Sequence, residues 1–548
     1  MQQAEEKQPP EKHLLAGWRR DAVVCLSLAN VFFTPGWEDL FSYRRMADLE
    51  LIRKTIPSPV DDAAVMMAVL LLAGLVFGAV RLARRHLGDR GFLAVPLAAL
   101  ALAAIPIGAQ RWNVEGLVLR LKSPVVTWMG YRGVLFLIAL ACVPLLWPIW
   151  KYQRRIAAVV SASLVVLSPF CLLTFGHAAW EMATYRGQPN PDGPLAPRLA
   201  GAPPPVRVVW IIFDEWDYRL TFVDRRASLS MPQIDRLRGE SLFATAAKSP
   251  FMETDQSLPS LITGRRLQGS VDASGSTVFV TPVGNREAKP LPWKESSTIF
   301  ASVRESGFNV GLTGWYFPYC RIMNGPLSEC AWWPMPSVRD GINENYLAGW
   351  METGFWGRVG GYTMSLLETY HLHSGQSSAA RYKARLCLEF MAESKKQVAD
   401  PALGLVFLHV PVPHNPHPYN RFTGRMDGSD RYPTGYIDSL ALTDRMMGEL
   451  RTVMESHGTW DHTVLLISAD HPFRWSRDLD GKFDRRVPFL LRFPGRPAAA
   501  VYAPEFDTIL SANLIYAILH GSVATVSDAA DWIDRHRGER ESPVPPGN

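Results

Sequence analysis

A threonine within residues 248–264, KSPFMETDQSLPSLITG, lies in a setting that could support nucleophilic chemistry. A proline and a polar run precede apolar residues at helical spacing, which predicts a loop leading into a short helix that Gly264 ends. The simplest interpretation makes Thr254 and Ser257 ordinary N-cap residues of that helix. The alternative makes Thr254 a nucleophile, which requires a nearby base or cation because a free aliphatic hydroxyl reacts poorly at neutral pH.

Two apolar strands end in side chains that could bind such a cation. One, VRVVWIIFDEWD, ends in Asp214-Glu215, and the other, TVLLISADH, ends in Asp470-His471. Continuous apolar runs of this kind are typical of buried parallel strands, whose carboxyl ends meet at one edge of a sheet. The alternative for each strand end is an ordinary polar turn. Two carboxylates, an imidazole and a hydroxyl suit one divalent ion, Zn²⁺ or Mn²⁺. The predicted metal ligands are Asp214, Thr254, Asp470 and His471.

The order and spacing of four short motifs resemble those of the alkaline phosphatase/sulfatase superfamily. The motifs are Asp214, T-x-x-S-x-P at Thr254–Pro259, His414-Asn415-Pro416 and Asp470-His471. Within the superfamily, residues 206 to about 522 are most similar to membrane-anchored phosphoethanolamine and phosphoglycerol transferases of cell envelopes. The resemblance implies transfer of a phospho-alcohol group from a membrane phospholipid donor to an envelope glycan or lipid acceptor, through a phospho-threonine at Thr254.

The resemblance assigns further roles near the predicted metal site. His414 occupies the position that in these transferases contacts the substrate phosphate or a second metal, so it is the candidate to protonate the leaving group or bind phosphate. Without the family, a histidine in a proline-rich loop is more often a surface residue. His409 and His417 are weaker candidates, and we expect His409 to point into the packing of its strand. Arg486 is a candidate phosphate-binding cation, although a solvated charge is slightly favoured. Glu215 is a possible additional metal ligand.

Two departures from the family pattern bear on the reaction. Pro472 stands where relatives commonly have glycine, and the run DRR at residues 484–486 stands where they often carry a histidine. Arginine cannot bind a cation, so we expect one metal ion rather than two. Thr254 and the residues after it do not form the C/S-x-P-x-R pattern of sulfatases, which disfavours sulfate hydrolysis. Phospho-alcohol transfer, phosphoester hydrolysis and a degenerate, non-catalytic envelope scaffold remain as hypotheses.

The first third of the 548-residue chain is much more apolar than the rest, which predicts two regions in different solvents. Its five apolar stretches are residues 22–37, 63–80, 92–109, 133–150 and 156–180. The last four approach or reach the roughly 20 residues that a bilayer-spanning helix needs, whereas the first is short and contains Asn30 and Pro35. We predict a five-helix transmembrane domain over residues 1–185.

The distribution of basic residues indicates how these helices would be oriented. Lysines and arginines before the first stretch and after the second and fourth favour a cytoplasmic N-terminus, although the opposite loops also carry positive charge. Five spans would then place the rest of the chain outside the cytoplasm. We therefore expect a bacterial inner-membrane protein with a periplasmic catalytic domain. A net charge of +5 without a basic, aromatic stripe gives no case for a nucleic-acid partner.

The pattern after the apolar third predicts one α/β domain. Residues 186–205 are rich in proline and glycine and predict an extended linker. Helical patterns alternate with apolar strands over residues 206–525, which predicts a mostly parallel sheet covered by helices on both faces. Residues 526–548 are expected to form a C-terminal tail. Cys320 and Cys330 flank a polar loop, and a disulfide and two free thiols are equally compatible with the sequence.

Overall fold

The computed structural model describes residues 12–43, 58–111, 151–152, 155–185, 192–201, 203–274, 277–283, 289–293, 298–334, 354–369, 376–426, 433–495, 499–543 and 545. The chain divides into two compact units. The first unit comprises Met1–Arg44, Pro57–Arg186 and Ser337–Gly375, and the second comprises Arg45–Ile56, Gly187–Pro336 and Gln376–Asn548. The first unit therefore includes Ser337–Gly375, which the sequence analysis placed within the catalytic domain of residues 206–525.

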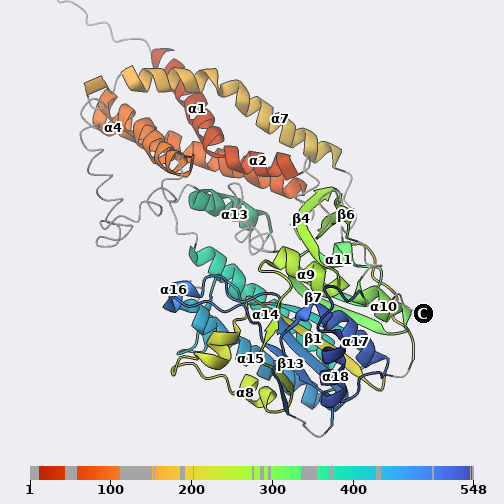
Figure 1. The fold of residues 1–548 in the computed structure, drawn as a ribbon. Coiled ribbons are helices and arrows are strands. Elements are labelled where there is room, and N and C mark those ends of the chain that lie inside the picture. Colours follow the sequence, from red (N-terminus) through yellow and green to blue (C-terminus); the bar gives the residue numbers. More distant parts are fainter. Residues whose placement is uncertain are drawn as a thin grey trace, which may run out of the picture. The chain divides into compact units, whose positions relative to one another are not determined.

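The first unit is helical wherever the structure describes it at length. Its helices are α1 (Lys12–Phe32), α2 (Thr34–Tyr43), α4 (Pro59–Arg111), a helical stretch at residues 155–166, α7 (Ser168–Thr184) and α13 (Gly354–Thr369) (Figure 1). Helices α1, α4 and α7 pack against one another, and α13 packs against α4. Their shared core contains large side chains from distant parts of the sequence, among them Trp37, Val65 and Tyr362.

Two helical segments of this unit are long and apolar enough to cross a membrane. They are Pro59–Ala83 and Arg155–Thr184, judged by length and composition among the described residues. The predicted five-helix transmembrane bundle is therefore corrected to two candidate spans. The predicted spans at 63–80 and 92–109 lie within the single helix α4, and the one at 133–150 lies outside the described residues.

The first predicted span, residues 22–37, is divided between α1 and α2 by a turn at Phe33. Pro35 lies in the first turn of α2, where its missing backbone N–H leaves no hydrogen bond unmade. Asn30 is buried, and its Oδ1 accepts hydrogen bonds from Trp37 Nε1 at 2.9 Å and from Thr174 Oγ1 at 3.0 Å. This polar residue therefore ties α1 to α2 and α7, which explains its presence in an apolar stretch.

The second unit is built on an eight-stranded sheet in the order β14-β2-β13-β12-β1-β9-β7-β8. The strands are β1 (Arg207–Asp214), β2 (Leu242–Ala244), β7 (Asn309–Tyr316), β8 (Glu329–Pro334), β9 (Leu403–Pro413), β12 (Thr463–Ala469), β13 (Phe489–Arg492) and β14 (Ala500–Tyr502). Of these eight strands, β13 alone runs antiparallel to its neighbours. The predicted mostly parallel sheet is confirmed.

Helices cover both faces of this sheet, as Figure 1 shows. On one face α14 (Gln376–Ala399) and α15 (Gly435–Ser456) pack on β9, and α8 (Pro232–Arg238) packs on α15. On the other face α10 (Ile299–Glu305) packs on β7, and α17 (Ser511–Leu519) packs on β1. Every residue of β1, β9 and β12 is buried, which explains why these strands are mostly continuous apolar runs rather than alternating ones.

Shorter elements complete the second unit. They are η1 (Arg219–Val223), β3 (Ala247–Lys248), α9 (Thr254–Thr263), β4 (Leu267–Ser274), β5 (Thr277–Pro282), β6 (Leu291–Pro292), α11 (Tyr319–Ile322), β10 (Tyr419–Asn420), β11 (Arg425–Met426), η3 (Trp460–His462), α16 (Arg477–Asp480), β15 (Phe506–Asp507), η4 (Thr508–Leu510) and α18 (Val526–His536). A disulfide joins Cys320 of α11 to Cys330 of β8, so the pair left open by the sequence is bonded.

The C-terminal residues include a packed helix where the sequence analysis expected a tail from residue 526. Helix α18 begins after Thr525, whose side chain accepts from the Asp528 N–H while the Asp528 carboxylate accepts from the Thr525 N–H. This reciprocal capping satisfies two backbone donors at the helix start. Trp532 and Ile533 are buried on its inner face. Its polar composition resembles that of a tail, but one face of the helix is apolar and packs on the unit's core.

Candidate active site

Three neighbouring strands bring acidic and imidazole side chains to one edge of the sheet. Asp214 is the last residue of β1, and Asp470 directly follows β12, the parallel neighbour of β1. Parallel strands end on the same side of a sheet, so the two carboxylates lie close together. On the opposite side of β1, β9 places His409 beside Ile212. Because these neighbouring strands are parallel, the polar residues at or near their carboxyl ends meet at one edge of the sheet.

Thr254 is the first residue of α9 and reaches the same place. Its Oγ1 donates a hydrogen bond to Asp470 Oδ2 at 2.8 Å, and the same oxygen lies 3.1 Å from His471 Nε2 and 3.5 Å from Asp214 Oδ2. The extended residue before it, Glu253, occupies the N-cap position that the sequence analysis gave to Thr254. The structure therefore brings together all four residues predicted as metal ligands.

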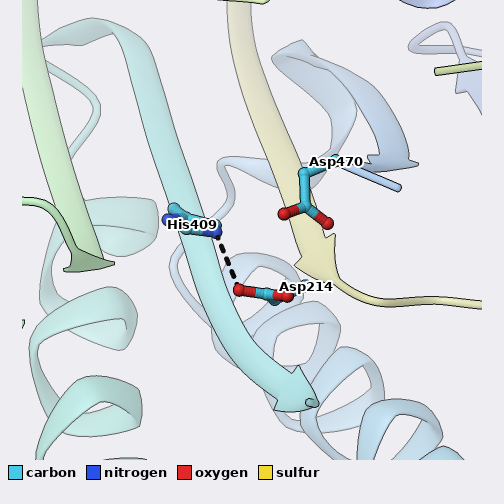
Figure 2. A group of neighbouring side chains, drawn as sticks. All are labelled: Asp214, His409 and Asp470. Carbon is cyan, nitrogen blue, oxygen red and sulfur yellow. Dashed lines mark ion pairs between the residues drawn. The ribbon is translucent and has the colours of Figure 1, made fainter. Parts of the chain in front are cut away.

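His409 belongs to this cluster, contrary to our expectation that it points into the packing of its strand. Figure 2 shows the carboxylates of Asp214 and Asp470 and the ring of His409 turned toward a shared space. One ligand atom from each of the three lies within 4.8 Å of the others, and all three side chains are buried. The signal in the sequence is a single histidine within LGLVFLHVPVP, a strand that is otherwise apolar and is buried along its whole length.

The hydrogen bonds of the histidines leave a lone pair directed into the site. His409 Nδ1 lies 2.9 Å from the carbonyl oxygen of Trp315, and His471 Nδ1 lies 3.0 Å from that of Pro472. A carbonyl only accepts, so each ring carries a proton on Nδ1, and when the ring is neutral its Nε2 holds a lone pair that can bind a cation. His409 Nε2 faces Asp214 Oδ2 at 3.6 Å without a hydrogen bond.

With His409 neutral, its Nε2 lone pair and the Asp214 carboxylate are two facing acceptors, an arrangement that fits a bound cation. Asp214 Oδ1 is also buried without a hydrogen-bond partner, which leaves a second acceptor oxygen in the same space. Metal-binding histidines characteristically donate their other N–H to a backbone carbonyl, as His409 and His471 do here. The carboxylate and imidazole donors fit a divalent metal ion of the Zn²⁺ or Mn²⁺ type.

Charge interactions within the cluster favour the same conclusion. Burial acts to raise the pKa of Asp214, but the histidines at 414, 409 and 471 outweigh it and hold this pKa below its usual range. Burial and the charge of Asp214 raise the pKa of Asp470. Burial acts to lower the pKa of His471, but the two carboxylates raise it overall. Ionisation of one carboxylate thus disfavours ionisation of the other. A divalent cation bound to both would remove this repulsion.

His414 lies beside this cluster and is buried, with 4% of its surface exposed. Its backbone N–H donates to the carbonyl oxygen of Asp214 at 3.1 Å, which fixes the loop to the end of β1. Its ring packs edge-on against Trp315 at 5.2 Å between centroids, and Nδ1 lies 2.6 Å from the carbonyl oxygen of Asn415. Nδ1–H donates to that carbonyl, so Nε2 is left to exchange a proton with a bound ligand.

Two other candidates have their charges paired with different neighbours. The Glu215 carboxylate accepts a hydrogen bond from Arg474 Nε at 3.0 Å, and it is the backbone N–H of Glu215 that reaches Asp470 Oδ1, also at 3.0 Å. Arg486 forms an ion pair with Asp484 at 2.6 Å. Among the described residues no hydrogen bond joins Arg486 to Thr254. Metal binding by Glu215 and phosphate binding by Arg486 stay predictions.

Backbone strain is concentrated at this edge of the sheet. Among the described residues, the non-glycine positions with positive φ are Glu215 at 66° and Tyr316 at 80°. Glu215 follows β1 and Tyr316 ends β7, so both lie at carboxyl ends of central strands. Conformations of this kind cost about 1–3 kcal/mol each and persist where surrounding structure imposes them, often at functional sites.

A comparison with protein-family models decides the family. The sulfatase model matches residues 207–520, more than half of the chain. The chain belongs to the sulfatase family. The resemblance to the alkaline phosphatase/sulfatase superfamily, which rested on four motifs, is confirmed. Members of the sulfatase family are metal-dependent enzymes, in agreement with the donor set found here.

Among the solved structures similar to this sulfatase-family chain are proteins named as a hydrolase, a sulfatase and a synthase. They include the phosphonate monoester hydrolase of Agrobacterium radiobacter, with 15% identity, 57% of this chain and 74% of that chain covered, and a TM-score of 0.36. The PsFucS1 sulfatase from Pseudoalteromonas sp. has 14% identity, with 59% and 68% covered and a TM-score of 0.37. The lipoteichoic acid synthase LtaP from Listeria monocytogenes has 13% identity, with 58% and 73% covered and a TM-score of 0.34. No curated protein matches the chain.

Proposed function

We propose that this protein transfers a phospho-alcohol group, similar to phosphoethanolamine or phosphoglycerol, from a membrane phospholipid to a glycan or lipid of the cell envelope. The reaction uses one divalent metal ion, Zn²⁺ or Mn²⁺, and passes through a phosphorylated Thr254. The observation that carries the proposal is the position of Thr254 Oγ1, which lies at a helix N-terminus within hydrogen-bond reach of Asp470 and His471. A hydroxyl placed among metal-binding groups is suited to nucleophilic attack on phosphorus.

The first half-reaction forms the phospho-threonine. A divalent cation held by Asp214, Asp470 and His471 would lower the pKa of the Thr254 hydroxyl and screen the charge of the phosphodiester. Asp470 accepts the hydrogen bond of that hydroxyl and takes its proton as Thr254 Oγ1 bonds to phosphorus. The bond from phosphorus to the lipid alcohol breaks, and His414 gives a proton to the departing oxygen.

The second half-reaction reverses these roles. The acceptor hydroxyl attacks phosphorus and gives its proton to His414, and the bond from phosphorus to Thr254 breaks. Asp470 then returns a proton to the threonine oxygen. The N-terminus of α9 carries a partial positive charge, which would stabilise the phosphoryl oxygens in both steps.

Two features support placing this reaction on the outer side of a bacterial inner membrane. The candidate spans Pro59–Ala83 and Arg155–Thr184 would hold the site near its lipid donor. The Cys320–Cys330 disulfide suits an oxidising compartment such as the periplasm, since cytoplasmic thiols are kept reduced. Both features concern the described residues, and the number of membrane crossings follows from neither.

Hydrolysis of a phosphoester and a non-catalytic scaffold are the alternatives. Hydrolysis uses the same phospho-threonine but passes the group to water. The scaffold is favoured by Pro472 in place of the common glycine and by the pairing of Arg486 with Asp484. Metal content separates the scaffold from the two enzymes, because a scaffold has no need of a stoichiometric cation.

Mass spectrometry of the purified full-length protein tests the proposal. We expect incubation with Mn²⁺ and phosphatidylethanolamine or phosphatidylglycerol to give a phospho-alcohol adduct on Thr254, with release of diacylglycerol. Thr254→Ala should give none, while Thr254→Ser keeps a hydroxyl and should retain some adduct. Release of the phosphorylated head group into water would instead favour hydrolysis. No adduct, no released head group and no bound metal would favour the scaffold.

A further inference from the structure

Helix α14 carries a buried lysine that the proposed reaction does not yet use. Lys383 has no exposed surface, and among the described residues its ammonium has no hydrogen-bond partner. Its Nζ lies 3.6 Å from the centre of the Trp315 ring, so its near neighbour is an aromatic face. Burying a charge without an acceptor is costly, and such groups in native proteins call for an explanation such as a missing ion or ligand.

Trp315 connects this ammonium to the active site. The carbonyl oxygen of Trp315 lies 2.9 Å from His409 Nδ1, and its indole ring packs edge-on against His414. Trp315 therefore contacts Lys383 as well as both histidines. Burial lowers the pKa of Lys383 to about 8 against the opposing effects of Cys387, Asp214 and Glu215, so the ammonium stays mostly protonated at neutral pH.

Two other basic side chains of the described residues, Arg474 and Arg486, have their charges paired with carboxylates. Arg474 pairs with Glu215 and with Glu253. Arg486, which the sequence offered as a candidate phosphate-binding cation, pairs with Asp484. An ammonium has three donors, and with one directed at the indole face the other two have no acceptor. A cation without a carboxylate partner is best suited to bind an incoming anion.

We propose that Lys383 binds an anionic oxygen of the substrate, namely a phosphoryl oxygen of the group that Thr254 attacks. This inference rests on the proposed function for the chemical class of that anion. The Trp315 ring holds the ammonium through a cation–π contact that leaves its other donors available. The indole also holds His414 in place, so the residue that binds the phosphoryl oxygen and the residue that protonates the leaving group are positioned by one side chain.

The thermal stability of a Lys383 variant distinguishes substrate binding by this lysine from a purely structural role. Lys383→Met has almost the same volume but removes the buried charge, and a buried charge without a partner destabilises the fold. If Lys383 serves substrate binding, the methionine variant keeps or raises the thermal midpoint while losing anion affinity. If Lys383 serves the fold through its contact with Trp315, the variant loses stability as well.

The experiment uses the full-length, Mn²⁺-loaded protein in detergent and inorganic phosphate as the probe, with binding measured by calorimetry. We expect Lys383→Met to weaken phosphate binding at least tenfold, with Mn²⁺ affinity unchanged and the thermal midpoint equal or higher. Lys383→Arg, which keeps the charge, should recover part of the affinity. The matched control is Lys396→Met on the same helix, since Lys396 is exposed and paired with Glu393.

Several outcomes would overturn the inference. Unchanged phosphate affinity in a folded Lys383→Met variant would do so, as would a loss of phosphate affinity accompanied by a fall in the thermal midpoint. If the methionine variant does not fold, the uncharged Lys383→Gln is judged by the same criteria. A wild-type protein that forms no Thr254 adduct but binds phosphate through Lys383 would refute the proposed function and leave the anion site standing.

Discussion

Thr254 differs from an ordinary threonine at the start of a helix because charged and imidazole groups surround its hydroxyl. Asp470 accepts its hydrogen bond at 2.8 Å, and His471 Nε2 lies 3.1 Å away. The hydroxyl is almost fully buried, so water competes little for these contacts. The surroundings of this hydroxyl are thus set by side chains more than 200 positions away, which follow a strand that ends beside it.

The clearest prediction at this scale concerns His409. His409→Gln removes an imidazole whose Nε2 faces Asp214 and has no hydrogen-bond partner among the described residues. Because this nitrogen is free to bind a cation, we expect the variant to lose at least about tenfold in Mn²⁺ affinity. Calorimetric titration of the metal-free protein with Mn²⁺ measures the loss, and circular dichroism checks the fold.

His417→Gln is the matched control for that change. His417 is buried on the loop that follows the same strand, but its Nδ1 lies 3.2 Å from Ser439 Oγ, away from the predicted ligands. The His417→Gln variant should bind Mn²⁺ with the same affinity as the wild type. Equal losses of affinity in the two variants would show that His409 acts through the fold rather than through the metal.

Sequence reasoning found the site residues that stand at strand ends and missed those inside elements. Asp214 and Asp470-His471 interrupt apolar runs, so their position could be inferred. His409 lies within a strand, and the spacing of apolar residues alone does not tell whether a buried histidine faces the core or a ligand. Lys383 lies in a helix with many charged residues, and nothing in that pattern distinguishes the one lysine that is fully buried.

At the scale of elements, the helix that carries Thr254 is held at both ends. Its N-terminus contacts the acidic cluster, and its C-terminus ends at Gly264 with φ of 67°. The carbonyl oxygen of Gly264 accepts a hydrogen bond from the N–H of Ser542 at 2.8 Å. A Cβ atom at Gly264 would lie 1.9 Å from the Ser542 carbonyl oxygen. The C-terminal segment, which the sequence placed in a tail, therefore packs closely on the helix of the nucleophile.

We expect Gly264→Ala to loosen α9. The alanine would have to adopt a left-handed conformation, which costs about 1–2 kcal/mol, and would also displace the backbone at Ser542. Hydrogen exchange of the α9 amides should become faster, since exchange reports local opening. Activity should fall with it, because Thr254 is the first residue of that helix.

Gly458→Ala separates the cost of the left-handed conformation from the cost of the close contact with Ser542. Gly458 has nearly the same φ, 69°, but nothing lies within 4 Å of a Cβ atom there. Both variants incur the conformational cost, and overpacking should add about 1–3 kcal/mol at Gly264 alone. Similar destabilisation by the two substitutions would show that the contact with Ser542 contributes nothing.

Helix and strand assignments in the second unit were predictable because apolar runs and helical periods alternate there. The strands of residues 207–214 and 463–469 appear where the sequence placed them. Helix α18 was not foreseen, since a short amphipathic helix rich in charge resembles a polar tail until its partner surface is known. Long-range packing, not local propensity, decides that case.

At the scale of the whole molecule, the chain passes from the second unit to the first and back within the predicted catalytic domain. Helix α13 lies in Ser337–Gly375 and packs its Tyr362 and Leu366 into the core of the first unit. Nothing in the sequence indicated this packing, because the pattern of an amphipathic helix reveals its apolar face but not the surface that covers that face. The chain therefore crosses between the units on either side of Ser337–Gly375, as well as on either side of Arg45–Ile56 and after Arg186.

An ion pair anchors α13 within the first unit. Arg358 donates to the carboxylate of Asp61 and, at 3.1 Å, to Ser58 Oγ. Asp61 is completely buried, so loss of the arginine would leave a carboxylate without its cation inside the core. Breaking a buried pair from one side costs about 3–5 kcal/mol, whereas an exposed pair contributes little.

A double-mutant cycle tests whether this pair holds the inserted segment. We expect Arg358→Met to lower the thermal midpoint of the full-length protein in detergent, since it strands the Asp61 charge, and Asp61→Asn to lower it less. The double variant should lose less than the sum of the two, with a coupling of about 1–3 kcal/mol. The pair His177–Glu181 on α7, four residues apart in the same unit, is the control and should couple by only about 0.2–0.5 kcal/mol. Additive losses at Arg358 and Asp61 would mean that apolar packing alone retains α13 and that the insertion is free to detach when its core contacts loosen.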